Sequence, residues 1–312
     1  MQASTEHKKG FFYKSGLYRY KKYGALSLML LPVIIYYLVF HYASMYGAVI
    51  AFKDYSFMKG IIGSPWVGLA NFRRMFMSDS FFEVFRNTLV ISLYKLITGF
   101  PAPILFAILL NELNGGRFKK TVQTISYLPH FLSWVILGGM FMQLLSLGGP
   151  INIFLKKIGL DPVFFLGDVR YFRSVLVITS LWKSIGWSSI IYLAALTGID
   201  PQLYEAARID GAGKIKQIIH ITLPSLIPVI TIMFIFSVGS IINDDFDQIF
   251  NLYNEAVYSV GDVISTYNYR IGMINNEYEY STAVGLFKNV IAIVLIFITN
   301  FTAKKFNDYG IW

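Results

Sequence analysis

The sequence predicts an all-α, polytopic membrane protein with about six transmembrane helices, and two observations carry that prediction. The 312-residue chain is 55% hydrophobic and only 14% charged, with a mean hydropathy of +0.54, whereas soluble domains carry about 25% charged residues. Six stretches are also long enough to cross the hydrocarbon core, which takes roughly 20 apolar residues. They lack the ten-residue alternation of membrane β-strands, which leaves helices.

The six helices are expected in one membrane domain, residues 23–303, flanked by tails at 1–22 and 304–312. Their expected bounds are 23–46, 88–110, 124–145, 174–196, 223–243 and 282–303. Lys and Arg gather in both tails and in the loops after the second and fourth helices, which is typical of the cytoplasmic side. Both termini and these two loops are therefore expected in the cytoplasm. The acidic segment before the last helix is expected outside.

Several function classes are disfavoured by composition and motifs. The chain has no Cys, so it has no disulfide or thiolate metal site, and its four His show no ligand spacing. No G-x-x-x-x-G-K-[ST] phosphate loop occurs, so any ATP must be hydrolysed by another polypeptide. No paired acid and base or metal set is visible in the spans, which argues against an enzyme. The net charge of +9 fits basic flanks on anionic lipid better than nucleic acid.

The loop after the fourth expected span carries the most specific pattern in the chain. It reads E-A-A-x3-G-x9-I-x-L-P from Glu205 to Pro224, with every fixed position filled. Asp200 and Pro201 suit the start of a short helix. Gly211 suits a tight turn, where a left-handed backbone would strain a residue with a Cβ. Two short helical segments with a turn between them are therefore expected within residues 200–224, which we call the coupling loop.

The coupling loop resembles the "EAA" loop of the membrane subunits of binding-protein-dependent ABC importers, in the sugar branch. That resemblance implies a loop that docks into a groove of the ATP-hydrolysing subunit. Glu205 would meet a basic residue there. The coupling positions it implies are Tyr204, Glu205, Ala206, Ala207, Ile209, Asp210, Gly211, Leu223 and Pro224.

The resemblance also implies partners and a location. The partners are a second homologous permease, two ATPase subunits that bind the ATP and Mg²⁺, an extracytoplasmic and lipid-anchored sugar-binding protein, and membrane lipid. This chain itself would hold no cofactor. The location would be the bacterial plasma membrane.

Polar side chains inside the expected fourth and fifth spans mark a candidate substrate path, because charges in hydrocarbon are costly. Lys183 shares a helical face with three other candidates at i, i+3, i+4, i+7 spacing. The candidates are Ser180, Lys183, Ser184 and Trp187 in one span, and Ser237, Ser240, Asp244 and Gln248 at the end of the next. Two roles stay open for Lys183: it binds a sugar, or it pairs with Asp244 or Asp245. For Lys95 and Lys288, structural pairing or snorkelling is favoured over ligand contact.

Further segments resemble permeases for complex-polysaccharide fragments. They are Gly68-Leu69-Ala70-Asn71-Phe72 (for which a helix on the membrane surface is the alternative), Tyr127-Leu128-Pro129-His130-Phe131, and the outer stretch at 247–267. Together with the cation Lys183, they suggest an acidic, uronate-containing oligosaccharide as substrate. A stand-alone secondary sugar transporter is the alternative. It predicts inverted repeats and membrane carboxylates as proton relays, and neither is visible.

Overall fold

The computed structural model describes residues 24, 28–113, 115–242 and 244–307. The expected N-terminal tail, 1–22, and the last five residues of the expected C-terminal tail lie outside the described residues. The described part is helical, with one isolated β-bridge between Lys53 and Trp66. Six helices within it are long and apolar enough to cross a membrane: Leu28–Phe52, Asp79–Glu112, Trp134–Lys157, Phe172–Thr197, Lys214–Gly239 and Tyr278–Lys305. The all-α prediction is confirmed.

The elements run along the chain as follows. After residues 28–36, which are helical, come η1 (Tyr37–Tyr42), η2 (Ser44–Phe52), α3 (Gly60–Gly63), α4 (Ala70–Phe76), α5 (Asp79–Gly99), α6 (Pro101–Glu112), α7 (Arg117–Tyr127), η3 (Leu128–Phe131), α8 (Trp134–Leu145) and α9 (Pro150–Lys157). The second half contains α10 (Phe172–Thr197), α11 (Pro201–Ile209), α12 (Lys214–Gln217), η4 (Ile218–Thr222), α13 (Leu223–Gly239), α14 (Phe246–Leu252), η5 (Glu255–Val257), α15 (Tyr258–Gly261), α16 (Ile264–Tyr269), η6 (Arg270–Ile274) and α17 (Tyr278–Asn307).

The second expected span begins earlier than predicted, at Asp79 instead of residue 88. The side chain of Ser78 caps α5 by accepting a hydrogen bond from the Phe81 amide at 3.3 Å, which fixes the start of the helix. A new helix, α6, begins at Pro101, since proline lacks the amide that would continue the ladder of α5.

The prediction of one continuous third helix over 124–145 is wrong. In the structure α7 ends at Tyr127, a 3₁₀ turn covers Leu128–Phe131, and α8 starts at Trp134. Pro129 sits in that turn, where it disrupts helical continuity. Ser133 then caps the new helix, accepting from the Ile136 amide at 3.4 Å.

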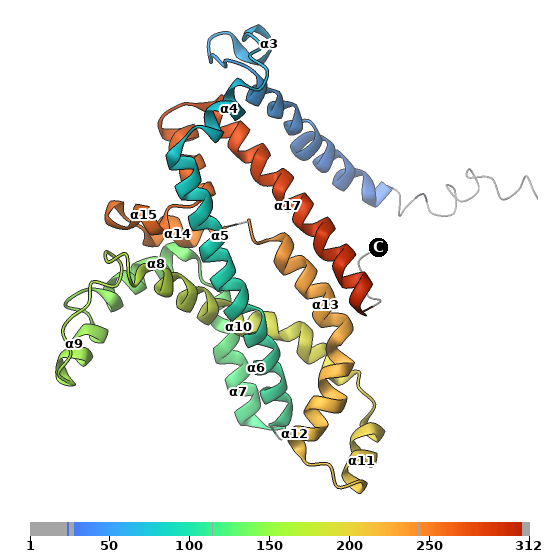
Figure 1. Cartoon of the computed structure of the whole chain (residues 1–312). Coiled ribbons are helices and arrows are strands. Elements are labelled where there is room, and N and C mark those ends of the chain that lie inside the picture. The colour runs from blue at the N-terminus through green and yellow to red at the C-terminus, as the bar shows by residue number, and fades with distance from the viewer. Residues whose placement is uncertain (1–23, 25–27, 114, 243, 308–312) are drawn as a thin grey trace, which may run out of the picture.

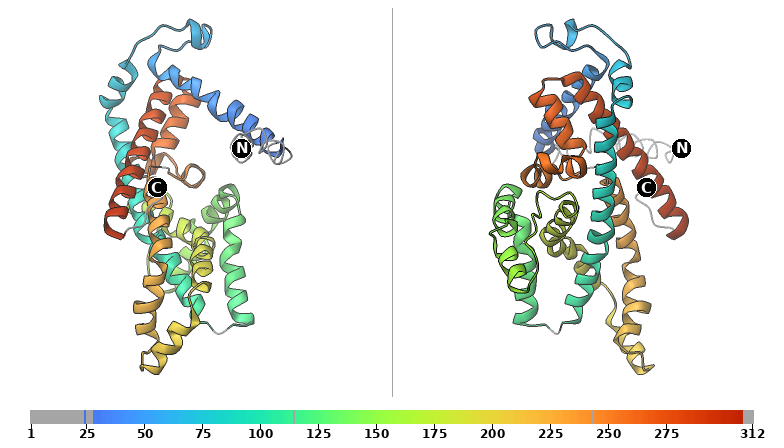
Figure 2. Two further views of the ribbon diagram at one scale, coloured as in Figure 1. Left: turned by 90° about the vertical axis from the view of Figure 1, so that its right-hand side faces the viewer. Right: turned by 60° about the vertical axis from the view of Figure 1, so that its left-hand side comes forward.

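Two ends of the molecule are set apart by the long helices. Figures 1 and 2 show α3 and α4 at one end and α11 and α12 at the other. Between them α10 lies at the centre and packs on α5, α6, α7 and α13, while α13 also packs along α17. This arrangement puts the coupling loop, with α11 and α12, at the opposite end from α3 and α4, which lie between the first two long helices. The predicted topology requires this separation.

The Gly68–Phe72 segment has a structural explanation. Gly68 adopts a φ of +60°, a left-handed conformation that favours glycine. The buried Asn71 amide then donates hydrogen bonds to the carbonyls of Ala51 and Lys53, both at 3.0 Å. Asn71 thereby ties α4 to the end of the first long helix, and α4 packs against α17. The segment therefore forms a junction between the first long helix, α4 and α17, and its position on the membrane surface stays a prediction.

Candidate functional site

The coupling loop folds locally as its sequence predicts. The Asp200 carboxylate accepts a hydrogen bond from the Gln202 amide at 2.9 Å, and Pro201 takes the first position of α11. Gly211 has a φ of +74°, and the Ala212 amide closes the turn onto the Ala207 carbonyl at 2.8 Å. A side chain at position 211 would be strained by the backbone alone, because the space around its Cβ position is open.

Internal contacts hold the coupling loop to the membrane domain. The Tyr204 hydroxyl lies 3.0 Å from the Thr222 hydroxyl and joins α11 to η4. Lys214 pairs with Glu112 at the end of α6, at 2.5 Å, which places the loops after the second and fourth spans at the same end. Tyr204 therefore stabilises the loop from within, and its predicted contact with the ATPase subunit stays a prediction.

The face of α11 that does not contact the membrane domain is exposed. Glu205, Ala206 and Asp210 are exposed and Ala207 is half-buried, while Ile209 is 87% exposed. Leu223 and Pro224 start α13 at the root of the loop. This exposed face of α11 is therefore free, among the described residues, to meet a partner protein.

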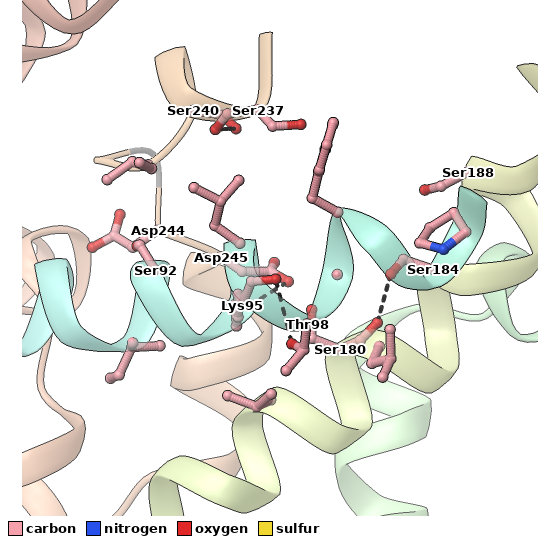
Figure 3. A pocket seen from close by; sticks show the side chains of 18 of the residues that line it. Ser92, Lys95, Thr98, Ser180, Ser184, Ser188, Ser237, Ser240, Asp244 and Asp245 are labelled. Carbon is pink, nitrogen blue, oxygen red and sulfur yellow. Dashed lines mark hydrogen bonds and ion pairs between the residues drawn. The ribbon is translucent and has the colours of Figure 1, made fainter. Parts of the chain in front are cut away.

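A cavity of about 800 Å³ lies between α5, α10 and α13, at the level of the start of α14. Its polar lining residues are Ser92, Lys95, Thr98, Ser180, Ser184, Ser188, Ser237, Ser240, Asp244, Asp245 and Asp247. Aromatic residues that line it include Phe100, Trp187, Tyr192 and Phe246. Figure 3 shows Ser237 and Ser240 across the cavity from Lys95 and Thr98.

Six of the eight predicted path residues line this cavity: Ser180, Ser184, Trp187, Ser237, Ser240 and Asp244. The helical spacing brings the α10 members together, and α13 supplies the opposite wall. Trp187 presents only part of its ring, since His130 stacks on it with centroids 4.4 Å apart. Contact of these residues with a sugar stays a prediction.

Lys183 does not line the cavity, contrary to expectation. Its ammonium donates to the backbone carbonyls of Pro129, His130 and Leu132, at 3.4, 3.0 and 2.5 Å. These carbonyls lie in and just after the η3 turn, and the Pro129 carbonyl also accepts a hydrogen bond from the Leu132 amide at 3.2 Å. The end of a helical turn leaves carbonyl oxygens that need a donor from outside the turn. The alternative pairing of Lys183 with Asp244 or Asp245 is wrong as well, because Asp244 pairs with Lys288 at 2.8 Å and Asp245 lies 3.9 Å from Lys95.

Gln248 is the second path residue that does not line the cavity. It is fully buried in α14 and donates to the Leu176 carbonyl at 2.7 Å and the Thr179 hydroxyl at 2.8 Å. Its amide oxygen accepts a hydrogen bond from Lys95. Gln248 therefore reaches the cavity only through Lys95, a residue that the sequence did not place on the path.

The comparisons with known proteins agree with these features. Residues 99–308 match the family described as "Binding-protein-dependent transport system inner membrane component". The polygalacturonan/rhamnogalacturonan transport system permease protein YteP of Bacillus subtilis (strain 168) is 44% identical over 92% of this chain and 90% of its own. The protein LplB of the same organism is 42% identical over 92% and 91%.

Solved structures give the same result. A chain of a bacterial ABC transporter involved in import of the acidic polysaccharide alginate aligns with a TM-score of 0.87 and 39% identity, over 93% of this chain and 99% of that one. A chain of the alginate ABC transporter in complex with an alginate pentasaccharide-bound periplasmic protein aligns with a TM-score of 0.88 and 38% identity, over 96% and 100%. These relatives are transport subunits, so the prediction that this chain is no enzyme is confirmed. The alternative, a stand-alone secondary sugar transporter, does not account for the match to this family. The chain belongs to the inner membrane components of binding-protein-dependent ABC transport systems.

Proposed function

We propose that the chain is the permease subunit of an ATP-driven importer for oligosaccharides of the acidic, uronate-containing class. The cavity between α5, α10 and α13 carries this proposal. Its seven serine and threonine side chains suit sugar hydroxyls, since a hydroxyl both donates and accepts hydrogen bonds, and the flat aromatic rings suit the apolar faces of sugar rings. Its volume of about 800 Å³ falls in the roughly 300–1,000 Å³ range of small-molecule pockets.

The acidic class is supported by the relatives and is compatible with the charges on the outer segment. From its sequence, the acidic segment before the last helix would be expected to repel an anion. In the structure, however, several of its carboxylates form ion pairs. Asp244 pairs with Lys288, Asp262 with Arg270, and Glu277 with Arg74 at 2.6 Å. An anionic sugar would therefore meet a weaker field than the composition suggests.

The proposed assembly contains a second homologous permease, two ATPase subunits and an extracytoplasmic, lipid-anchored sugar-binding protein in the bacterial plasma membrane. ATP and Mg²⁺ would be bound by the ATPase subunits. The coupling loop would dock on an ATPase subunit through Glu205, Ala206 and Ile209, with Gly211 setting the turn. Closure of the ATPase subunits would then push the loop and reorient the helices that line the cavity.

The proposal is tested by uptake into cells or proteoliposomes that contain the whole importer. We expect uptake of radiolabelled oligogalacturonides or alginate oligomers, and at least about tenfold less uptake of the same oligosaccharides after their carboxyl groups are reduced to alcohols. A lost charged hydrogen bond corresponds to about this factor. Uptake of neutral oligosaccharides alone would contradict the acidic class, and absence of any oligosaccharide uptake would contradict the function.

The proposed topology places both termini and the coupling loop in the cytoplasm. The native chain has no Cys, so a single introduced Cys reports its own side. Asn275, at an exposed outer turn, and Gln202, on exposed α11, suit this test. We expect an impermeant maleimide added outside intact spheroplasts to label Asn275→Cys and to leave Gln202→Cys unlabelled until the membrane is permeabilised. The reverse pattern would invert the topology.

A further inference from the structure

We propose that Lys95 binds the carboxylate of an acidic sugar in the cavity, and that Asp245 occupies this cation in the absence of substrate. This inference rests on the proposed acidic substrate class and names the residue that determines it. The sequence pointed to Lys183 as the candidate ligand residue and favoured structural pairing or snorkelling for Lys95 and Lys288. The distinction comes from how the three ammonium groups are used.

Of the three lysines Lys95, Lys183 and Lys288, which lie in the interior of long helices, the last two already have strong partners. Lys183 has three N–H donors, and it directs hydrogen bonds to three backbone carbonyls. Lys288 forms a 2.8 Å ion pair with Asp244, whose side chain is only 2% exposed. Asp244 in turn accepts hydrogen bonds from the Ser265 amide, at 2.9 Å, and the Ser265 hydroxyl. Neither lysine lines the cavity.

Lys95 differs in both respects. It lines the cavity, its side chain is 19% exposed, and among the described residues its ammonium donates a hydrogen bond to Gln248 alone. Gln248 is held by α10 through the Leu176 carbonyl and the Thr179 hydroxyl, so it fixes the position of the ammonium. Lys95 is thus an oriented cation with donor capacity left over.

Asp245 is a loose counter-ion. Its nearest carboxylate oxygen lies 3.9 Å from the Lys95 nitrogen, and its side chain is 40% exposed. This distance is too long for a hydrogen bond, and exposed ion pairs are weak. A sugar carboxylate could form the short charged hydrogen bond that Asp245 does not form, and such bonds are stronger than neutral ones. Asp245 can then turn towards water. Because the sugar carboxylate replaces the Asp245 carboxylate, Lys95 has an anionic partner both with and without substrate.

The surroundings of Lys95 fit a sugar next to its carboxylate. Ser92 and Thr98 flank Lys95 on α5 at i−3 and i+3, and Ser180 and Ser184 approach from α10 (Figure 3). The Thr98 and Ser184 hydroxyls donate to backbone carbonyls of their own helices at 2.8 Å, which leaves their oxygens as acceptors for sugar hydroxyls. Among the described residues that line the cavity, Lys95 is the one Lys or Arg, and hydroxyl acceptors lie beside it. The lining carboxylates are Asp244, which is paired with Lys288, and Asp245 and Asp247.

Three variants of the assembled importer test the inference, with the same binding protein throughout and oligogalacturonide as the probe. Lys95→Met is expected to lower the uptake of the acidic sugar at least about tenfold, the factor for one lost charged hydrogen bond. Asp245→Asn is expected to lower the half-saturating concentration several-fold, because it removes the competing anion. The double variant is expected to stay as low as Lys95→Met.

A structural ion pair predicts different signs for the same variants. Both single changes would then impair uptake, and the double change would restore it, because no charge is left unpaired. Impaired uptake by Asp245→Asn, or restored uptake by the double variant, would overturn the inference. Co-purification of the ATPase subunits with each variant separates loss of binding from loss of assembly. If the wild-type importer takes up only carboxyl-reduced sugar, the proposed substrate class fails instead, which this comparison also reveals.

Discussion

Replacing Glu205 by Lys is expected to lower transport at least about 30-fold and to detach the ATPase subunits, while the six spans remain folded. Glu205 is exposed on α11 and has no ion pair among the described residues, so its loss costs this chain little stability. Docked in a groove, the carboxylate would be desolvated against a basic partner. Removing one member of a buried charged pair costs about 2–5 kcal/mol, and a reversed charge adds repulsion.

The measurement is uptake of oligosaccharide together with co-purification of the ATPase subunits. Thr121→Lys is a matched control, since it adds the same cation to an exposed site of α7 outside the coupling loop. Glu205→Gln should fall between the wild type and Glu205→Lys. Wild-type transport by Glu205→Lys would show that this residue has no docking role.

The coupling loop could be predicted from the sequence because its structure is determined locally. Asp200, Pro201 and Gly211 act on neighbouring backbone groups, and the structure shows the cap and the positive φ that those residue types favour. The hydrogen bond between Tyr204 and Thr222 could not be predicted, because Thr222 lies across the turn. A contact between two short elements is not encoded in the periodicity of either.

The cavity could be predicted only in part, for the same physical reason. Helical spacing correctly placed Ser180, Ser184 and Trp187 on one face of α10. It could not show that the η3 turn, about 50 residues earlier in the chain, presents its carbonyls to Lys183. Nor could it show that buried Gln248 would orient Lys95 into the cavity. Hydrophobic pattern determines which residues are inside, whereas the partner of a buried charge depends on tertiary packing.

Lys183→Met is expected to reduce transport of acidic and neutral sugars alike and to destabilise the isolated subunit. The change removes the donor that the carbonyls of Pro129, His130 and Leu132 share. The Pro129 carbonyl keeps the Leu132 amide as a donor, whereas the other two carbonyls lose the ammonium, and an unsatisfied polar group costs about 1–3 kcal/mol. The turn between α7 and α8 would loosen, and with it His130, which stacks on Trp187 at the cavity wall. Thermal unfolding of the detergent-extracted subunit measures the loss of stability, and uptake measures the loss of transport.

Lys120→Met is the control, because it removes an exposed lysine at the start of α7 and should leave both readouts unchanged. Adding Asp244→Leu to Lys183→Met should lower both readouts further, since Asp244 is the partner of Lys288 and its removal leaves the Lys288 ammonium unpaired within the membrane. Rescue by Asp244→Leu would instead mean that Lys183 and Asp244 pair in the working transporter. Loss confined to acidic sugars would move the carboxylate site from Lys95 to Lys183. Lys183 and Lys95 are therefore expected to have different roles. The Lys183 ammonium donates to three backbone carbonyls and supports the fold, whereas the Lys95 ammonium has donor capacity left and selects the substrate.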